Sequence, residues 1–177
     1  MRTPVDMKSL NALDRASFVA AVGGIFENSP WVAEAIWGKM PFASLDALHR
    51  AMTDYIRTQP PAAQIGLLRA HPELAGRDAR LGAITDDSAA EQAAAGLDRL
   101  SDAEAARFDM LNRAYCEKFG FPFIIAVHDH SRVSILAQFE KRLANDIETE
   151  IANALEQVFR ITWLRLERAF GAAARMS

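Results

Sequence analysis

The chain of 177 residues is predicted to be all-α, a single compact domain of seven to eight helices that spans residues 1–177. Helix-starting residues recur along the chain, and apolar residues repeat at spacings of three and four. Segments that alternate like a β-strand are nearly absent. Half of the residues are hydrophobic and 24% are charged, which is typical of a globular domain of this length.

Several of the predicted helices have a start signal. Asn11 precedes the first helix, and Ser29 with Pro30 opens the second with a capping serine and a proline at the first helical position. Ser101 and Glu104 have the spacing of a capping box, and Gly120 is a typical residue to end that helix. The helices are expected at 12–28, 30–40, 45–58, 61–70, 102–119, 132–145 and 147–170, with a further helix that starts near Ser88.

Composition limits the class of partner. A net charge of -3 and a pI near 5.8 offer no electrostatic attraction for nucleic acid or for an anionic membrane. The longest apolar run, 121–127, is about a third of a membrane span. Residues 1–11 lack the apolar segment of a secretory leader, and the single cysteine excludes an intrachain disulfide. A cytoplasmic protein without nucleic-acid or membrane partners is therefore expected.

Some reactive side chains are discounted. His128 and His130 flank Asp129, but no third and fourth ligand stands at a recognisable spacing, so no metal site is expected. Cys116 lies inside a predicted helix with no histidine near it in sequence, which argues against a catalytic thiol. His49 lies on a charged helix and is expected at the surface.

A proline directly after a histidine breaks the pattern at His71. Pro72 cannot donate a backbone hydrogen bond and pushes the residue before it out of helical geometry. His71 is therefore expected at the end of a helix, where its ring can be directed at a particular group.

A second irregularity is the start of the helix near Ser88. Ser88 and Glu91 have the spacing of a capping box, which would satisfy the helix's own amides. Ser88, Glu91 and Gln92 also share one face of the first turn, where N–H groups and the helix dipole favour an anionic ligand. Both interpretations can hold together.

The last predicted helix carries an arginine among apolar residues. Arg165 follows Ile151 and Val158 at spacings of seven, inside the apolar arc, while Gln157 lies on the opposite, polar side. A buried guanidinium is costly unless it is paired. Arg165 is therefore either a snorkelling or ion-paired residue, or a clamp for an anion or a carbonyl group.

The run FPFIIAV at 121–127 is either a buried strand or an extended crossing of the core. With no partner strand in view, its backbone N–H and C=O groups need other partners. A polar ligand, ordered water and loop side chains are equally open.

Four stretches, taken in order, resemble the 2-oxo-4-hydroxy-4-carboxy-5-ureidoimidazoline (OHCU) decarboxylase family of urate breakdown. They are HPELAG, TDDSAAEQAAAGLDRL, LNRAYCEKFGFPFIIAV and RLANDIETEIANALEQVFRITWLRL, and the resemblance covers about residues 9–170. It implies an all-helical enzyme, commonly a homodimer, that needs no metal or organic cofactor and converts OHCU to (S)-allantoin and CO2. Where the family often continues with Arg-Gly or Lys-Gly, this chain has His128-Asp129-His130.

The resemblance also implies roles for single residues. The family's catalytic histidine and glutamate fall on His71 and Glu91, and a substrate-binding arginine falls on Arg165. Further substrate contacts fall on Pro72, Ser88, Gln92, Phe123, Ile124, Ile125 and Val127.

These roles suit the chemistry of a decarboxylation. His71 can act as the acid and base, because imidazole titrates near neutral pH. Glu91 can either set the tautomer of that ring or accept the substrate's hydroxyl proton. Arg165 is expected on the ureido or ring carbonyl, since a tight pair with the carboxylate would stabilise the ground state. The alternatives are a non-enzymatic helical interaction domain, and the same fold acting on another ureido or hydroxy acid.

Overall fold

A computed structural model describes residues 6–174 of the chain. In that range the chain forms ten α-helices and two short 3-10 helices, and it forms no β-strand. The all-α prediction is therefore confirmed, and 121–127 is not a strand. Residues 1–5, which belong to the segment 1–11 predicted to lack a leader, lie outside the described residues, as do residues 175–177.

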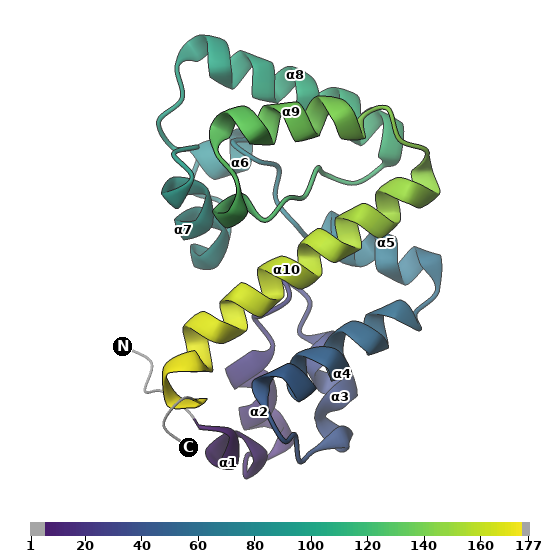
Figure 1. The fold of residues 1–177 in the computed structure, drawn as a ribbon, viewed down its shortest axis with the longest axis vertical. Helices are drawn as coiled ribbons and strands as arrows, with labels where there is room; N and C mark the ends of the chain where they lie inside the picture. Colours follow the sequence, from purple (N-terminus) through teal and green to yellow (C-terminus); the bar gives the residue numbers. More distant parts are fainter. Residues whose placement is uncertain (1–5, 175–177) are drawn as a thin grey trace. The chain divides into compact units, whose positions relative to one another are not determined.

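Figure 1 shows the helices in chain order. Eight of them correspond to the predicted ones, whereas α1 and α6 were not predicted, because four or five residues are too few to show a helical period. The elements are α1 (Met7–Asn11), α2 (Arg15–Val22), α3 (Trp31–Ile36), η1 (Trp37–Lys39), α4 (Leu45–Arg57), α5 (Pro61–Arg69), α6 (Arg77–Arg80), α7 (Asp86–Ala94), α8 (Asp102–Phe119), η2 (Val127–Asp129), α9 (Arg132–Arg142) and α10 (Ile147–Ala174).

The predicted starts of α2 and α3 are wrong. Asp14, not Asn11, caps α2, and its carboxylate accepts the Ser17 N–H at 2.8 Å. Asn11 instead ends α1 and bonds through its side-chain amide to the N–H and C=O of Phe42, at 2.8 and 2.9 Å. Pro30 is the N-cap of α3, and no side chain caps that helix. Local sequence alone did not reveal these longer-range contacts.

The start and the end of α8 are as predicted. Ser101 and Glu104 form a complete capping box, and Gly120 ends the helix in the left-handed region with φ of 76°. Ser44 caps α4 through the Ala47 N–H, as its sequence position indicated. These starts were predictable because both partners lie within three residues of each other.

The helices group into two compact units, and each is described by itself. The described part of unit 1 is 6–64 with 159–174, and unit 2 is 65–158, so α5 and α10 contribute residues to both. The single domain over 1–177 stays a prediction.

Unit 1 is built around α3, which packs against α2 and α4. The rings of Phe18 and Phe42 stack with their centroids 6.3 Å apart. The core is aliphatic and aromatic, so that the N-terminal helices are held chiefly by hydrophobic burial. Its fully buried side chains include Leu10, Phe18, Phe26, Ile36, Leu48, Met52, Ile56 and Leu166.

Unit 2 has an aromatic core between α8 and α9, which run side by side (Figure 1). Tyr115 of α8 lies at its centre, with ring centroids 4.6 to 5.9 Å from those of its neighbours. Those neighbours are Phe119, Phe121, Phe123 and Phe139. The run at 121–127 is wholly buried, because its aromatic side chains belong to this cluster. In the described part of the chain, no helix is long and apolar enough to cross a membrane.

Candidate active site

His71 lies where the sequence predicted, just past the C-terminal end of α5. Its backbone N–H donates to the Leu68 carbonyl at 3.2 Å, and Pro72 then turns the chain away from the helix. His71 is 8% exposed, and the Nδ1 of its ring lies 3.1 Å from the carbonyl oxygen of Leu67. A carbonyl can only accept, so Nδ1 carries the proton, and a neutral ring then has its lone pair on Nε2.

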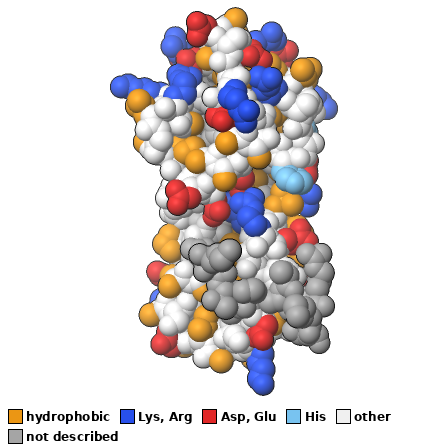
Figure 2. Space-filling view, turned by 90° about the vertical axis from the view of Figure 1, so that its left-hand side faces the viewer, with side chains coloured by type: hydrophobic (Ala, Val, Ile, Leu, Met, Phe, Trp, Pro, Cys, Tyr) orange, Lys and Arg blue, Asp and Glu red, His pale blue; other side chains and the backbone are white. Residues whose placement is uncertain are grey.

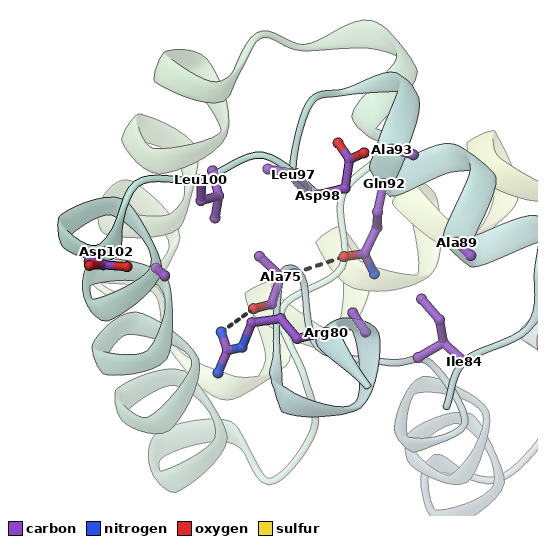
Figure 3. A pocket seen from close by; sticks show the side chains of 12 residues that line it. Ala75, Arg80, Ile84, Ala89, Gln92, Ala93, Leu97, Asp98, Leu100 and Asp102 are labelled. Carbon is purple, nitrogen blue, oxygen red and sulfur yellow. Dashed lines mark hydrogen bonds between the residues drawn. The ribbon is translucent and has the colours of Figure 1, made fainter. Parts of the chain in front are cut away.

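The turn after His71 is held in an unusual backbone conformation. Ala75 has φ of 50°, in the left-handed region that residues with a side chain rarely adopt. Its N–H donates to Gln92 Oε1 at 2.8 Å, and its carbonyl accepts from Arg80 Nη1 at 2.6 Å (Figure 3). Asn112 of α8 donates to the carbonyl of Leu74 at 2.9 Å. Side chains from three helices therefore determine the path of this turn.

Helix α7 begins three residues earlier than the capping-box prediction required. Thr85 is its N-cap, and the Thr85 hydroxyl accepts the N–H of Ser88 at 3.3 Å. A capping box between Ser88 and Glu91 is therefore wrong, because Ser88 is already inside the helix. Ser88 and Gln92 are buried and Glu91 is half-buried. The three residues share a face, as their spacing of three and four indicated.

Gln92 links α7 to the turn after His71. Besides the bond to Ala75, its Nε2 lies 3.4 Å from the carbonyl oxygen of Glu73. A side-chain amide has two donor hydrogens and two acceptor lone pairs, so these contacts use half of its capacity. A supporting role for Gln92 is thus compatible with the predicted contact to substrate.

The third predicted segment lies beside α7. The run at 121–127 ends in η2, which starts at Val127 and packs against α7. Two side chains hold the run: Arg142 Nη1 donates to the Ile124 carbonyl at 2.7 Å, and Gln157 Oε1 accepts the Ala126 N–H at 2.9 Å. Side chains of α9 and α10 thus supply some of the hydrogen-bond partners that the backbone of this run needs.

The backbone groups of Phe123 and Ile125 have no such partners. Among residues 6–174, neither the N–H nor the C=O of these two residues forms a hydrogen bond. Both residues are nearly inaccessible, at 0% and 3% exposure. Buried backbone polar groups are nearly always satisfied in proteins, so these four groups are candidates for contact with a ligand.

Arg165, the remaining predicted site residue, belongs to unit 1. It is 3% exposed, as its place in the apolar arc of α10 predicted, and its Nη1 bonds to Oε2 of Glu27 at 2.7 Å. Glu27 is also buried and comes from the turn before α3. Sequence analysis anticipated an ion pair as one interpretation of Arg165 but did not identify its partner, which is 138 residues away.

A second buried Arg–Glu pair, between Arg142 and Glu150, was missed. Arg142 Nε and Nη2 lie 2.7 and 2.6 Å from Glu150 Oε1, and the guanidinium stacks over the Phe123 ring at 4.4 Å. Tyr115 also donates to Glu150, and Asn145 does so at 2.8 Å. Burial raises the pKa of the Tyr115 hydroxyl, and the Glu150 carboxylate adds to that shift. No helical spacing marks this pair, because α9 ends between the two residues.

A pocket of about 560 Å³ lies next to the turn after His71, between α6, α7 and the start of α8 (Figure 3). Its walls are mostly apolar, with Arg80, Asp98 and Asp102 among the lining residues. Of the predicted site residues, Gln92 alone lines it. The pocket therefore borders the candidate site without containing His71 or Glu91.

The reactive side chains to which the sequence assigned no role differ in burial and in their contacts. Among the described residues, no three His, Cys, Asp or Glu side chains are grouped so that they could hold a metal. Burial raises the pKa of the Cys116 thiol to about 11, and the carboxylate of Glu73, 3.5 Å away, adds to the rise. His49 is half-buried, not a surface residue, and its Nε2 lies 3.0 Å from the hydroxyl of Thr162.

Comparisons with known proteins cover nearly the whole chain. The model of the family described as OHCU decarboxylase matches residues 11–167. A 2-oxo-4-hydroxy-4-carboxy-5-ureidoimidazoline decarboxylase of Halalkalicoccus jeotgali is 44% identical over 93% of this chain and 92% of its own length. One of Amia calva, with the same name, is 40% identical over 92% of this chain and 93% of its own.

A solved structure described as (S)-allantoin synthase has a similar fold. It is 32% identical, with a TM-score of 0.76 over 94% of this chain. The chain spans about half of that protein, 54% of its length.

Proposed function

The chain belongs to the OHCU decarboxylase family, and we propose that it converts OHCU to (S)-allantoin and CO2 in urate breakdown. The observation that carries this function is the match over residues 11–167, which includes every residue predicted for the site. Membership of an enzyme family sets aside the non-enzymatic interaction domain. The remaining alternative, another ureido or hydroxy acid as substrate, is decided by the assay below.

The reaction cleaves one C–C bond and moves three protons. The C–C bond to the carboxylate breaks and CO2 leaves, while its electron pair forms a C=C bond to the carbon that bears the ureido arm and the imine electron pair passes to the ring nitrogen, which takes up a proton. The hydroxyl group then loses its proton and becomes a carbonyl, and the C=C electron pair accepts a proton at the carbon that bears the ureido arm. Delivery to one face of that carbon decides the handedness of the allantoin.

We propose that His71 carries a proton through Nε2. The contact of Nδ1 with the Leu67 carbonyl supports this role, because it holds the ring in one tautomer and one orientation. Glu91 is then not required to set the tautomer. Its proposed role is to accept the proton of the substrate hydroxyl, from the same helical face as Ser88 and Gln92.

Arg165 is proposed to bind a carbonyl of the substrate. Pairing with Glu27 lowers the net charge at the guanidinium, which weakens its attraction for a carboxylate while leaving hydrogen-bond donation to a neutral carbonyl possible. Such a contact strengthens as charge grows on the carbonyl in the transition state. The unpaired backbone groups of Phe123 and Ile125 support the predicted contacts of 123–127 with substrate.

The test is to generate OHCU in place from urate and to follow both its decay and the circular dichroism of the allantoin formed. The wild type should speed the decay and yield the (S) form. His71→Asn keeps the fold but cannot shuttle a proton, so turnover should fall by about two to four orders of magnitude. Glu91→Gln should lose turnover with little change in stability, since Thr85 and not Glu91 serves the cap. Near-wild-type decay with (S)-allantoin in either variant would refute its assigned role.

No metal or organic cofactor is proposed, so turnover should persist after exhaustive treatment with EDTA. Activity that is lost and then restored by one particular metal would require His128 and His130 to be reconsidered.

We further propose a cytoplasmic homodimer with a small-molecule substrate and no nucleic-acid partner. Figure 2 supports the last point, because Lys and Arg are interspersed with Asp and Glu over the described residues of the visible face. Light scattering at micromolar concentration should give twice the monomer mass of 19.5 kDa, and a monomer mass would refute the dimer.

A further inference from the structure

We propose that Gln157 and Arg142 are positioning residues that aim the backbone N–H and C=O of Ile125 at the substrate. The inference rests on the proposed function and extends it to two side chains that have no other assigned role there. Both belong to unit 2, as does Ile125.

The first step of the argument concerns the N–H of Ile125. This group shares a planar peptide with the carbonyl of Ile124, and in a trans peptide the two point in opposite directions. Arg142 holds that carbonyl at 2.7 Å and is itself fixed by Glu150 and by the ring of Phe123. The Ile125 N–H is therefore directed away from Arg142 and stays fixed as long as the ion pair is formed.

The second step concerns the C=O of Ile125. It shares its peptide with the N–H of Ala126, which donates to Gln157 Oε1 at 2.9 Å. The same planarity directs the Ile125 carbonyl away from Gln157. The two side chains thus hold the peptides on either side of Ile125, whose own N–H and C=O have no partner among residues 6–174.

The group that this arrangement fits is a cyclic or linear urea edge. A ureido arm and a ring amide each present an N–H donor beside a C=O acceptor, the complement of one residue's own donor and acceptor. A buried peptide that is already oriented loses little entropy on binding, so its position affects affinity directly. Gln157 is half-buried, which makes it the better residue to change, because Arg142 is part of a buried ion pair.

The experiment compares Gln157→Met with Gln157→Glu. Methionine matches the length of the side chain but cannot accept the Ala126 N–H, whereas glutamate keeps an acceptor oxygen. Gln157→Met should raise KM for OHCU about tenfold with a smaller change in kcat, as expected when binding common to ground and transition states is lost. Gln157→Glu should restore most of that KM. Deuterium exchange in the peptide covering 121–127 should quicken in the methionine variant only.

Gln64→Met is the matched control. Gln64 also bonds a backbone group, donating to the Ile56 carbonyl at 3.1 Å in unit 1, and losing it should leave KM unchanged. An unchanged KM in Gln157→Met, or an equal rise of KM in the methionine and glutamate variants, would overturn the inference. The proposed function would still hold in that case, provided that the wild type turns over OHCU. A wild type that does not decarboxylate OHCU would refute the proposed function, and the assignment of Ile125 to this substrate would fall with it.

Discussion

Among residues 6–174, two arginines are buried against a glutamate, and they were not equally visible in the sequence. Arg165 pairs with Glu27 in unit 1, and Arg142 pairs with Glu150 in unit 2. Both guanidinium groups are nearly inaccessible, at 3% and 7% exposure of the side chain. Arg165 stood out because it interrupts the apolar face of a long helix. Arg142 looked like an ordinary basic residue in the last turn of α9.

The two pairs have different proposed tasks. Arg142 is enclosed by protein groups, since it bonds the Ile124 carbonyl and stacks on Phe123 while Tyr115 and Asn145 complete the shell of Glu150. It therefore serves the fold and, as we propose, the position of Ile125. Arg165 is the residue that we propose to bind a carbonyl of the substrate. A buried ion pair by itself is weak evidence of either task, because desolvation can cancel its attraction.

The largest effect is expected when Arg142 is removed. Arg142→Met leaves the carboxylate of Glu150 buried without its cation, and breaking a buried pair in this way costs about 3–5 kcal/mol in the free energy of unfolding. Urea denaturation should show the loss as a lower midpoint. Arg107→Met is the control, because its pair with Glu140 is half-exposed and should contribute no more than about 1 kcal/mol. Equal urea midpoints for the two variants would contradict the structural role of Arg142.

A smaller effect, on turnover and not on stability, is expected when the pair of Arg165 and Glu27 is removed. The double variant Arg165→Met with Glu27→Gln removes both charges of the pair together, so neither partner is left buried without its counterion and the protein should remain folded. Turnover of OHCU should fall by about two to three orders of magnitude, the usual cost of losing one donor to a developing negative charge. Removing the exposed pair of Arg15 and Glu34 in the same manner should leave the rate unchanged. Wild-type turnover in the first double variant would contradict the proposed role of Arg165.

A moderate effect is expected when only the negative partner is neutralised. Glu27→Gln retains an acceptor for Arg165 but restores full positive charge to the guanidinium, which then attracts the substrate carboxylate. Stronger ground-state binding should lower KM and reduce kcat by roughly tenfold. Steady-state kinetics separate the two parameters. A raised KM with unchanged kcat would mean that Glu27 does not restrain the charge of Arg165.

The smallest effect concerns His49, a half-buried histidine whose ring contacts a hydroxyl group and not a carboxylate. Burial lowers the pKa of His49 below its ordinary value of 6.5, so the folded state keeps the ring neutral while the unfolded state takes up a proton first. The contribution of His49 to stability is therefore absent above the unfolded pKa and becomes unfavourable as the pH falls below about 6.5. His49→Gln should lessen the decline in thermal midpoint between pH 7 and pH 5. An identical decline in both proteins would contradict the shift.

Much of the fold was predictable because its signals are local. The capping box of Ser101 and Glu104, the C-cap at Gly120 and the break at His71-Pro72 each involve residues only a few positions apart. The failures have the same origin. Thr85 rather than Ser88 begins α7, because several residues in that acidic stretch can act as a cap and packing decides among them.

By itself the sequence determined that the protein is helical, that His71 ends a helix and that Arg165 is buried, because period and backbone sterics act within a few turns of chain. Only the tertiary structure decided which glutamate each arginine pairs with and that the Leu67 carbonyl sets the tautomer of His71. It also decided that Gln157, on the predicted polar side of α10, accepts the N–H of Ala126. Such pairings depend on groups brought together across as many as 138 residues. No repeat of three or four residues encodes them, since each exists only after the core has excluded water from both partners.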